Sequence, residues 1–248
     1  MTKSFKDQIR PYIVKALQKA KVNRLAHRVY YRYVHGFDTA NKAVLDAQKR
    51  CFEHALASGV AFAGDYMEFG IFKGYAFWHA QKVANDNKLT DIRFFGFDSF
   101  AGLPDVTGND VSKNDVFYKG QYTCDKETVT KNLDLKGIDW SRTYLVEGYF
   151  NDSLTPELRK KYNLNKISIA LIDCDLYSST KDVLDYIGDM VVDQTLFMFD
   201  DWNCYDRDDN HGQRKAFREF LEQNTALSAE SFFEYGAYGQ VFIMRKKS

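Results

Sequence analysis

Apolar residues recur along the chain with two different spacings. In residues 4–33 and 39–58 they fall every three or four positions, which predicts two helices, the second with Thr39 as its N-cap. Further along, the apolar residues gather instead into runs of six or seven. Such runs predict strands, and they occupy residues 65–70, 93–98, 143–148, 167–173 and 195–201.

Helical spacing returns between several of these runs, at residues 73–86, 126–133, 178–190 and 212–223. Strands that alternate with helices indicate a parallel sheet with helices on both faces. After the last helical stretch, "SFFEYGAYGQVFIMRKK" predicts two more strands around Gly236 and Gly239, in a hairpin-like edge. We therefore expect an α/β fold, with an N-terminal helical extension over residues 1–58 and one α/β domain over residues 59–248.

Polar residues stand at the carboxyl end of every predicted parallel strand. A sheet of this kind binds its ligand at that edge, so these positions are the candidates for a binding site. In chain order they are Glu68 and Gly70, Asp98 and Ser99, Glu147 and Gly148, Asp173 and Asp175, and Asp200 and Asp201. Carboxylates at the ends of buried strands are costly to desolvate, so an acid at all five ends indicates a function.

The first two strand ends predict a site for a cofactor that contains adenosine. Gly70 and Gly74 allow close backbone approach or unusual dihedral angles where the first strand passes into a helix. There is no G-x-G-x-x-G and no Walker motif at this turn, so phosphate binding is not expected. Asp98 can accept hydrogen bonds from the hydroxyls of a ribose. The candidate cofactor-binding residues are Glu68, Gly70, Asp98, Ser99, Asp173, and Tyr149 and Phe150, whose rings could stack on an adenine.

Three carboxylates, from Asp173, Asp200 and Asp201, should converge from two adjacent strands. Oxygen ligands suit Mg²⁺, Ca²⁺ or Mn²⁺, and a cation would offset the repulsion among them. We interpret the three as a divalent metal site with Mg²⁺ as the expected ion; the alternative is that Asp200 or Asp201 caps the next helix. Asp175, and His211 in the polar loop after Asp201, are the candidate catalytic residues. The other histidines fall on helical stretches, where we expect packing or surface positions: His27, His35, His54 and His79.

Composition narrows the classes of partner. The chain of 248 residues has no net charge, but residues 1–32 hold nine Lys and Arg and one acid, so the remainder is acidic. An acidic body does not indicate a nucleic-acid binder. The basic segment could contact an anionic membrane or an anionic substrate, or it could be a solvated helix face. Four widely spaced cysteines predict free thiols in a cytoplasmic protein, and no stretch is typical of a signal peptide or a transmembrane segment.

Five motifs occur in a characteristic order: "DYMEFGIFKG", "FGFDSFAGLP", "EGYFNDSL", "LIDCDLYSST" and "FDDWN". Over roughly residues 60–224, this series resembles the macrocin O-methyltransferase family, which uses S-adenosylmethionine and a divalent metal to methylate hydroxyls of sugar-bearing natural products. The resemblance implies a Rossmann-like, seven-stranded class I methyltransferase sheet. It matches Asp173, Asp200 and Asp201 to the family's metal acids, and Glu68, Gly70 and Asp98 to its cofactor region. A small-molecule or saccharide acceptor follows from it, and the N-terminal helices could pack against a second subunit.

Two departures from the family pattern leave alternatives open. The sugar methyltransferases of the family use a His from a lid segment as base, and residues 105–127 contain no His. Relatives of the catechol type have a Lys where this chain has Leu176. One alternative is a metal-dependent glycosyltransferase, because Asp173-Cys174-Asp175 is a D-x-D motif; another is a cofactor-binding protein that has kept the fold and lost the base.

Overall fold

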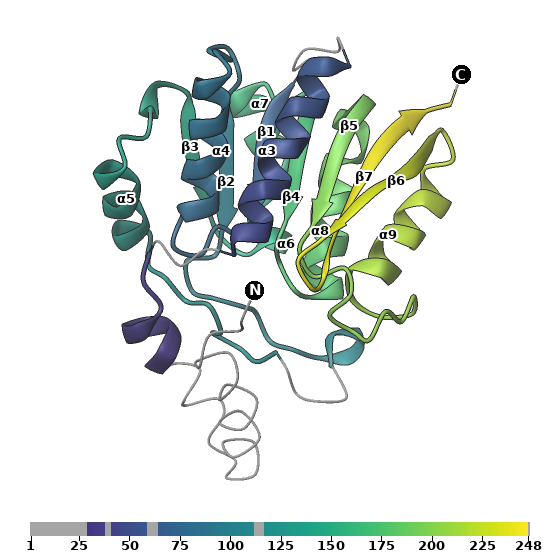
Figure 1. Cartoon of the computed structure of the whole chain (residues 1–248). Helices are drawn as coiled ribbons and strands as arrows, with labels where there is room; N and C mark the ends of the chain where they lie inside the picture. Colours follow the sequence, from purple (N-terminus) through teal and green to yellow (C-terminus); the bar gives the residue numbers. More distant parts are fainter. Residues whose placement is uncertain (1–28, 38–40, 59–63, 112–116, 248) are drawn as a thin grey trace, which may run out of the picture.

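The structure is a computed structural model that describes residues 29–37, 41–58, 64–111 and 117–247 (Figure 1). Most of the predicted helix over residues 4–33, most of the basic segment 1–32 and the predicted N-cap Thr39 lie outside these residues. The pairing of two subunits through the N-terminal helices therefore stays a prediction. The second helix begins at Lys42, and its N-cap is Asn41, whose side chain accepts a hydrogen bond from the N–H of Ala43.

Seven strands form one sheet, in the order β3-β2-β1-β4-β5-β7-β6 (Figure 1). The strand pairs among β1 to β5 are parallel, whereas β7 is antiparallel to both β5 and β6. This arrangement confirms the predicted α/β fold, its five parallel strands and the hairpin at the edge. The strands are β1 (Asp65–Phe69), β2 (Phe94–Asp98), β3 (Thr143–Glu147), β4 (Ile167–Ile172), β5 (Val191–Phe199), β6 (Leu227–Tyr235) and β7 (Gly239–Lys246).

Helices cover both faces of the sheet, and each set packs on its own hydrophobic core. One core is formed with α3 (Lys42–Ala57), α4 (Tyr75–Asp86) and α5 (Lys126–Leu135). The other is formed with α6 (Phe150–Ser153), α7 (Pro156–Tyr162), α8 (Tyr177–Ile187) and α9 (Gly212–Gln223). Single short turns of helix complete the described elements: η1 (Tyr30–Val34), η2 (Gly108–Asp110), η3 (Trp140–Arg142) and η4 (Gly188–Met190).

The pattern of apolar residues explains why the sheet is buried on both faces. Successive side chains of a strand point to opposite faces, and in β1 Tyr66 enters the core of α3 and α4 while Met67 and Phe69 enter the core of α8 and α9. Because helices cover both faces, a strand such as β4 is buried along its whole length and forms a nearly continuous apolar run rather than an alternating one. In the described residues, no helix combines the length and the apolar character that a membrane crossing requires.

Helix α3 belongs to the core of this domain. Its residues Cys51 and Phe52 are fully buried, in the same core as Tyr66 of β1 and Ile243 of β7. The predicted boundary between residues 58 and 59 stays a prediction, but α3, on its N-terminal side, contributes apolar side chains to the sheet's packing.

The strand order reverses between β1 and β4: the chain continues from β1 to β2 and β3 on one side, and from β4 to β5 on the other. In sheets of this type, a crevice for ligands lies at the carboxyl ends of the two strands where the order reverses. Gly70 ends β1 with a φ of +89°, and a Cβ atom at this position would lie 1.8 Å from the carbonyl oxygen of Asp173. Glycine is therefore required here for two reasons, its dihedral angle and the close approach of a second backbone.

Replacement of Gly70 by alanine should lower the free energy of unfolding by more than about 3 kcal/mol, because strain and a backbone clash coincide. Gly137 is the matched control, since its φ is +68° but no atom lies within 4 Å of the added Cβ. Gly137→Ala should cost only the dihedral strain, about 1–2 kcal/mol. Urea unfolding of both variants measures the difference, and equal losses would contradict the role of the Asp173 carbonyl.

Candidate active site

One cavity of about 1090 Å³ opens at the carboxyl ends of the parallel strands. Most of the residues predicted from the strand ends meet in it. Its lining includes Glu68, Gly70, Asp98, Ser99, Tyr149, Phe150, Asp173, Asp175, Asp200 and Asp201. Among the described residues, ten carboxylate side chains and two lysines line this cavity, so its interior is strongly acidic.

Asp98, at the end of β2, organises the turn that follows β1. Its Oδ2 accepts hydrogen bonds from the backbone N–H groups of Ile71 and Phe72 at 2.8 and 3.0 Å, and its Oδ1 accepts one from Phe100 at 2.7 Å. Burial raises the pKa of Asp98, and these three donors oppose the rise. Because a carboxylate oxygen has two acceptor positions, Oδ1 keeps room for one further donor, such as a ribose hydroxyl. Asp98 therefore braces the β1–α4 turn, and its predicted contact with a ribose stays a prediction.

Glu68 is 1% exposed and ends a chain of buried hydrogen bonds that starts on α3. The Gln48 amide of α3 donates to the Tyr66 hydroxyl at 2.9 Å, and that hydroxyl donates to Glu68 Oε2 at 2.6 Å. Burial raises the pKa of the Glu68 carboxyl to about 8, because charge in a desolvated site is unfavourable. Glu68 is therefore an anchored side chain at the floor of the cavity, beside Gly70.

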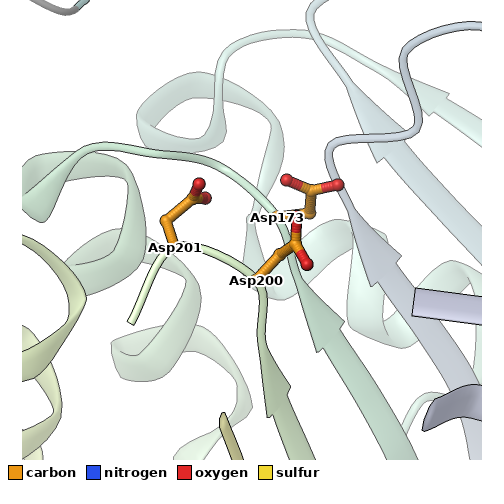
Figure 2. Close-up of side chains that lie close together, drawn as sticks. All are labelled: Asp173, Asp200 and Asp201. Atoms are coloured by element: carbon orange, nitrogen blue, oxygen red, sulfur yellow. The ribbon is translucent and has the colours of Figure 1, made fainter. Parts of the chain in front are cut away.

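Asp173, Asp200 and Asp201 form the acid triad, the name we use for these three residues. Each offers a carboxylate oxygen, and all three oxygens lie within 4.8 Å of one another. Figure 2 shows the side chains extending into one space from the ends of β4 and β5. The backbone fixes the placement, since the N–H of Asp200 donates to Ile172 and the N–H of Asp201 donates to the side chain of Gln213.

Negative charge is poorly compensated within the acid triad. Burial, and then the neighbouring Asp201, raise the pKa of Asp200 to about 7. Burial likewise raises the pKa of Asp201 to about 6, although the N–H of Asp175 donates to its Oδ2 at 2.9 Å. Desolvation and the two other acids raise the pKa of Asp173 well above its usual range. Three hard oxygen donors held in this state fit a divalent cation such as Mg²⁺.

The two predicted catalytic residues differ in position. Asp175 is buried and lies against the acid triad, with a backbone φ of +61° and an N–H that donates to Asp201. His211 does not line the cavity. It precedes α9, and its Nδ1 pairs with the Asp208 carboxylate at 2.9 Å while its ring stacks on Tyr205. The structure therefore does not support His211 as a catalytic residue, because its loop turns the ring toward a local partner.

Four rings that the sequence analysis did not identify also line the cavity. We call them the aromatic wall, and they are Tyr31, His35, Phe72 and Tyr122. The ring centroids of Tyr31 and Tyr122 are 5.0 Å apart, and His35 lies 5.7 Å from Phe72. His35 was expected to be a packing or surface residue, and that expectation is wrong in one respect, since it reaches the cavity. Burial, and next the Lys73 charge, lower the pKa of His35. Tyr31 and His35 precede α3, where there is no strand-end signal, so nothing local in the sequence placed these two rings at the site.

Asp110, which the sequence analysis also did not identify, lines the cavity and connects three segments of the chain by hydrogen bonds. It is 3% exposed, and its carboxylate accepts hydrogen bonds from the N–H and the hydroxyl of Ser178 at 3.0 and 2.7 Å. The Tyr205 hydroxyl donates to the carbonyl of Asp110 at 3.1 Å. The loops after β2, β4 and β5 are thereby joined. Its position in a polar loop gave no sign of this burial.

Several known proteins that resemble the chain are O-methyltransferases. Residues 31–229 match the family model for Macrocin-O-methyltransferase (TylF). The chain is 26% identical over 146 residues to Mycinamicin III 3''-O-methyltransferase of Micromonospora griseorubida, which covers 56% of this chain and 55% of that protein. It is 25% identical over 162 residues to 8-demethyl-8-(2,3-dimethoxy-alpha-L-rhamnosyl)-tetracenomycin-C 4'-O-methyltransferase of Streptomyces olivaceus, which covers 64% and 59%. The chain thus spans between 55% and 59% of the length of these curated relatives.

Solved structures confirm the predicted fold class. The chain resembles the O-methyltransferase NovP with a TM-score of 0.67 and 21% identity, over 82% of this chain and 79% of that one. It resembles an O-methyltransferase from Bacillus cereus in complex with SAH with a TM-score of 0.53 and 14% identity, over 90% and 97%. At these identities the likeness shows the fold, a Rossmann-like methyltransferase sheet.

The buried Glu68 carboxyl predicts how stability changes with pH in the metal-free protein. Its pKa of about 8 in the folded state exceeds the value of about 4.3 expected in the unfolded chain. Between about pH 5 and 8 the folded state holds a proton that the unfolded state has released, so the free energy of unfolding should fall as pH rises. Glu68→Gln removes this proton and should make the fall shallower, without abolishing it, because the other buried acids act in the same direction.

Urea unfolding with a chelator at pH 5, 6, 7 and 8 measures this slope. Glu147→Gln is the matched control, because Glu147 ends the neighbouring β3 but is exposed. It should keep the wild-type slope. The same slope in Glu68→Gln as in the wild type would mean that Glu68 stays ionised throughout this range.

Proposed function

The chain belongs to the macrocin-O-methyltransferase family, and on that premise we propose that it transfers a methyl group from S-adenosylmethionine to a hydroxyl of a sugar or a glycosylated small molecule. We further propose that a divalent cation, Mg²⁺ in the first place, binds the acid triad of Asp173, Asp200 and Asp201. The observation that carries this proposal is the convergence of the acid triad and the β1 and β2 strand ends on one cavity.

The relatives support a sugar as acceptor. One of them is named for the 4'-O-methylation of a rhamnosyl-tetracenomycin, and the other for the 3''-O-methylation of mycinamicin III. The relative from Bacillus cereus that shares the fold was solved with SAH, which supports S-adenosylmethionine as the methyl donor. Free thiols at all four cysteines suit a reducing compartment, in line with the proposal that the protein works in the cytoplasm.

In the proposed reaction, the β1–α4 turn and the β2 end hold the cofactor. Asp98 fixes the backbone N–H groups of the turn and keeps one acceptor position on Oδ1. Tyr149 and Phe150, which follow β3, also line the cavity. S-adenosylmethionine, when bound, supplies an electrophilic methyl group. These residues would keep it close to the acceptor and aligned with it.

The residues around the acid triad would handle the acceptor's proton. A divalent cation, when bound, lowers the pKa of a hydroxyl that it contacts. Asp175 lies directly beside the triad, and burial, followed by Asp201 and Asp200, raises the pKa of its carboxyl. A bound cation would offset the negative charges that help to raise this pKa. Because the carboxyl lies beside the acid triad and lines the same cavity, we assign Asp175 as the proton acceptor. His35, on the aromatic wall, is a second group in the cavity that can accept a proton.

The charge of the cavity argues against the glycosyltransferase alternative. A nucleotide-sugar diphosphate needs basic partners, whereas the described lining holds ten carboxylates and two lysines, of which Lys119 pairs with Asp105. The same charge favours a neutral or cationic acceptor over a phosphorylated one. The non-catalytic alternative is weakened by Asp175 and His35, which supply groups for proton transfer although the lid lacks a histidine.

Cofactor binding is the first test. Isothermal calorimetry should show micromolar affinity for S-adenosylhomocysteine, about −8 kcal/mol. Asp98→Asn should weaken it about tenfold or more, since it removes the charge that orders the turn and about 1–3 kcal/mol of hydrogen bonding. Asp105→Asn is the control, because Asp105 also lines the cavity but pairs with Lys119. Equal affinities in the two variants would contradict the role of Asp98.

Methyl transfer is the decisive test. Incubation with methyl-labelled S-adenosylmethionine and a panel of glycosides should label an acceptor, and a chelator should abolish the labelling until Mg²⁺ is added back. Asp200→Asn keeps the shape of the side chain but removes one charge, so the labelling should fall at least tenfold. Asp182→Asn is the control, because Asp182 lines the cavity away from the acid triad. Full labelling in the presence of chelator would mean that the triad is not a catalytic metal site.

A further inference from the structure

Tyr235, the last residue of β6, lies near Asp200, because its partner Gly239 in β7 precedes Gln240, which pairs with Phe199 at the end of β5. It is 7% exposed and belongs to the core that α3 forms with the sheet. Its ring lies across Gly239, its partner in the antiparallel pair with β7, so closely that a Cβ atom on Gly239 would stand 2.4 Å from the ring. The turn between β6 and β7 thus holds the ring in one place and leaves its hydroxyl little freedom.

The hydroxyl of Tyr235 is buried, and among the described residues it has no hydrogen-bond partner of normal geometry. Such a group is rare in folded proteins, because leaving it unpaired costs free energy. Burial, and then the charges of Asp200 and Asp173, raise the pKa of Tyr235. In turn, the hydroxyl acts on Asp200 as a hydrogen-bond donor and opposes the rise in its pKa. The Tyr235 hydroxyl therefore faces the Asp200 carboxylate but makes no hydrogen bond of normal geometry to it.

A second tyrosine beside an acid of this site shows what is missing. The hydroxyl of Tyr66 in β1 donates to Glu68, which lines the cavity, at 2.6 Å. Tyr235 has the same kind of neighbour, Asp200, but its interaction with that carboxylate falls short of a hydrogen bond of normal geometry. The difference is that Asp200 belongs to the acid triad. Carboxylates that bind a metal are usually held by a further hydrogen bond, which orients them and tunes their affinity.

We propose that Tyr235 is a positioning residue for the cation site, which donates a hydrogen bond to the Asp200 carboxylate when the acid triad holds a divalent cation. This inference rests on the proposed function, because it presupposes a cation at the triad. It assigns a role to the hairpin of β6 and β7, which otherwise contributes no side chain to the chemistry proposed above.

Tyr235→Phe tests the inference, because it keeps the ring over Gly239 and removes only the hydroxyl. Binding of Mn²⁺, followed by the electron paramagnetic resonance signal of the free ion, should weaken about tenfold. The chain offers a matched control in Tyr186 of α8, whose hydroxyl is also buried without a partner but lies in the core on the opposite face of the sheet. Tyr186→Phe should bind Mn²⁺ as the wild type does.

A second readout needs no metal. In the presence of a chelator, both variants should melt at the wild-type temperature or above it, because each removes an unpaired buried hydroxyl. Affinity for S-adenosylhomocysteine should be unchanged in both.

Unchanged Mn²⁺ binding in Tyr235→Phe, while the wild type binds the ion, would overturn the inference and leave the proposed function standing. Equal weakening in both variants would also overturn it, since it would indicate a general effect of losing a hydroxyl from the core. Failure of the wild type to bind Mn²⁺ would overturn both the proposed cation site and the inference.

Discussion

Negative charge held in a desolvated space is the constraint on which this site depends. Parallel strands bring their carboxyl ends to one edge of the sheet, and here that edge presents acids from β1, β2, β4 and β5 to a single cavity. Like charges a few ångströms apart and partly out of water repel strongly. The hydrogen bonds that some of these acids accept from the chain compensate for part of this repulsion.

The compensation differs from one acid to the next. Asp98 is stabilised by three backbone N–H groups, so it can be charged and still belong to the fold. Glu68 accepts one hydrogen bond from Tyr66, and burial raises its pKa to about 8, so its carboxyl avoids the charge by keeping a proton. The acid triad has the least compensation from the chain itself, which is why a cation is the most economical physical explanation for it. The same strands therefore serve the fold and the site: their apolar residues form the two cores, and the acids at their carboxyl ends line the cavity.

The strands of the sheet and the acids at their ends could be predicted from the sequence, because each depends only on residues that are neighbours in the chain. A buried parallel strand is a short apolar run, and the polar residue at its end must lie at the common edge, so Asp98 or Asp173 can be placed without knowing any contact. The same reasoning cannot find a residue whose role depends on distant partners. Tyr122 and His35 come from loops, Gln48 acts through Tyr66, and Tyr235 matters because its ring crosses Gly239.

Where the pattern failed, the cause was also physical. Helices α6 and α7 have four and seven residues, which is too short for the helical spacing of apolar positions to repeat. His211 follows the acid triad in the chain, but Asp206 and Arg207 have positive φ values in the loop between them, and the His211 ring meets Asp208 instead of the cavity.

The order of strands has a consequence for how the chain folds as it is synthesised. β7 follows β6 in the chain but lies between β6 and β5, so neither β5 nor β6 can complete its pairing until β7 has left the ribosome. Until then β5, with its run of buried apolar residues, presents an open edge that can pair with another nascent chain. During the interval between the synthesis of β5 and that of β7, this edge is therefore open to aggregation.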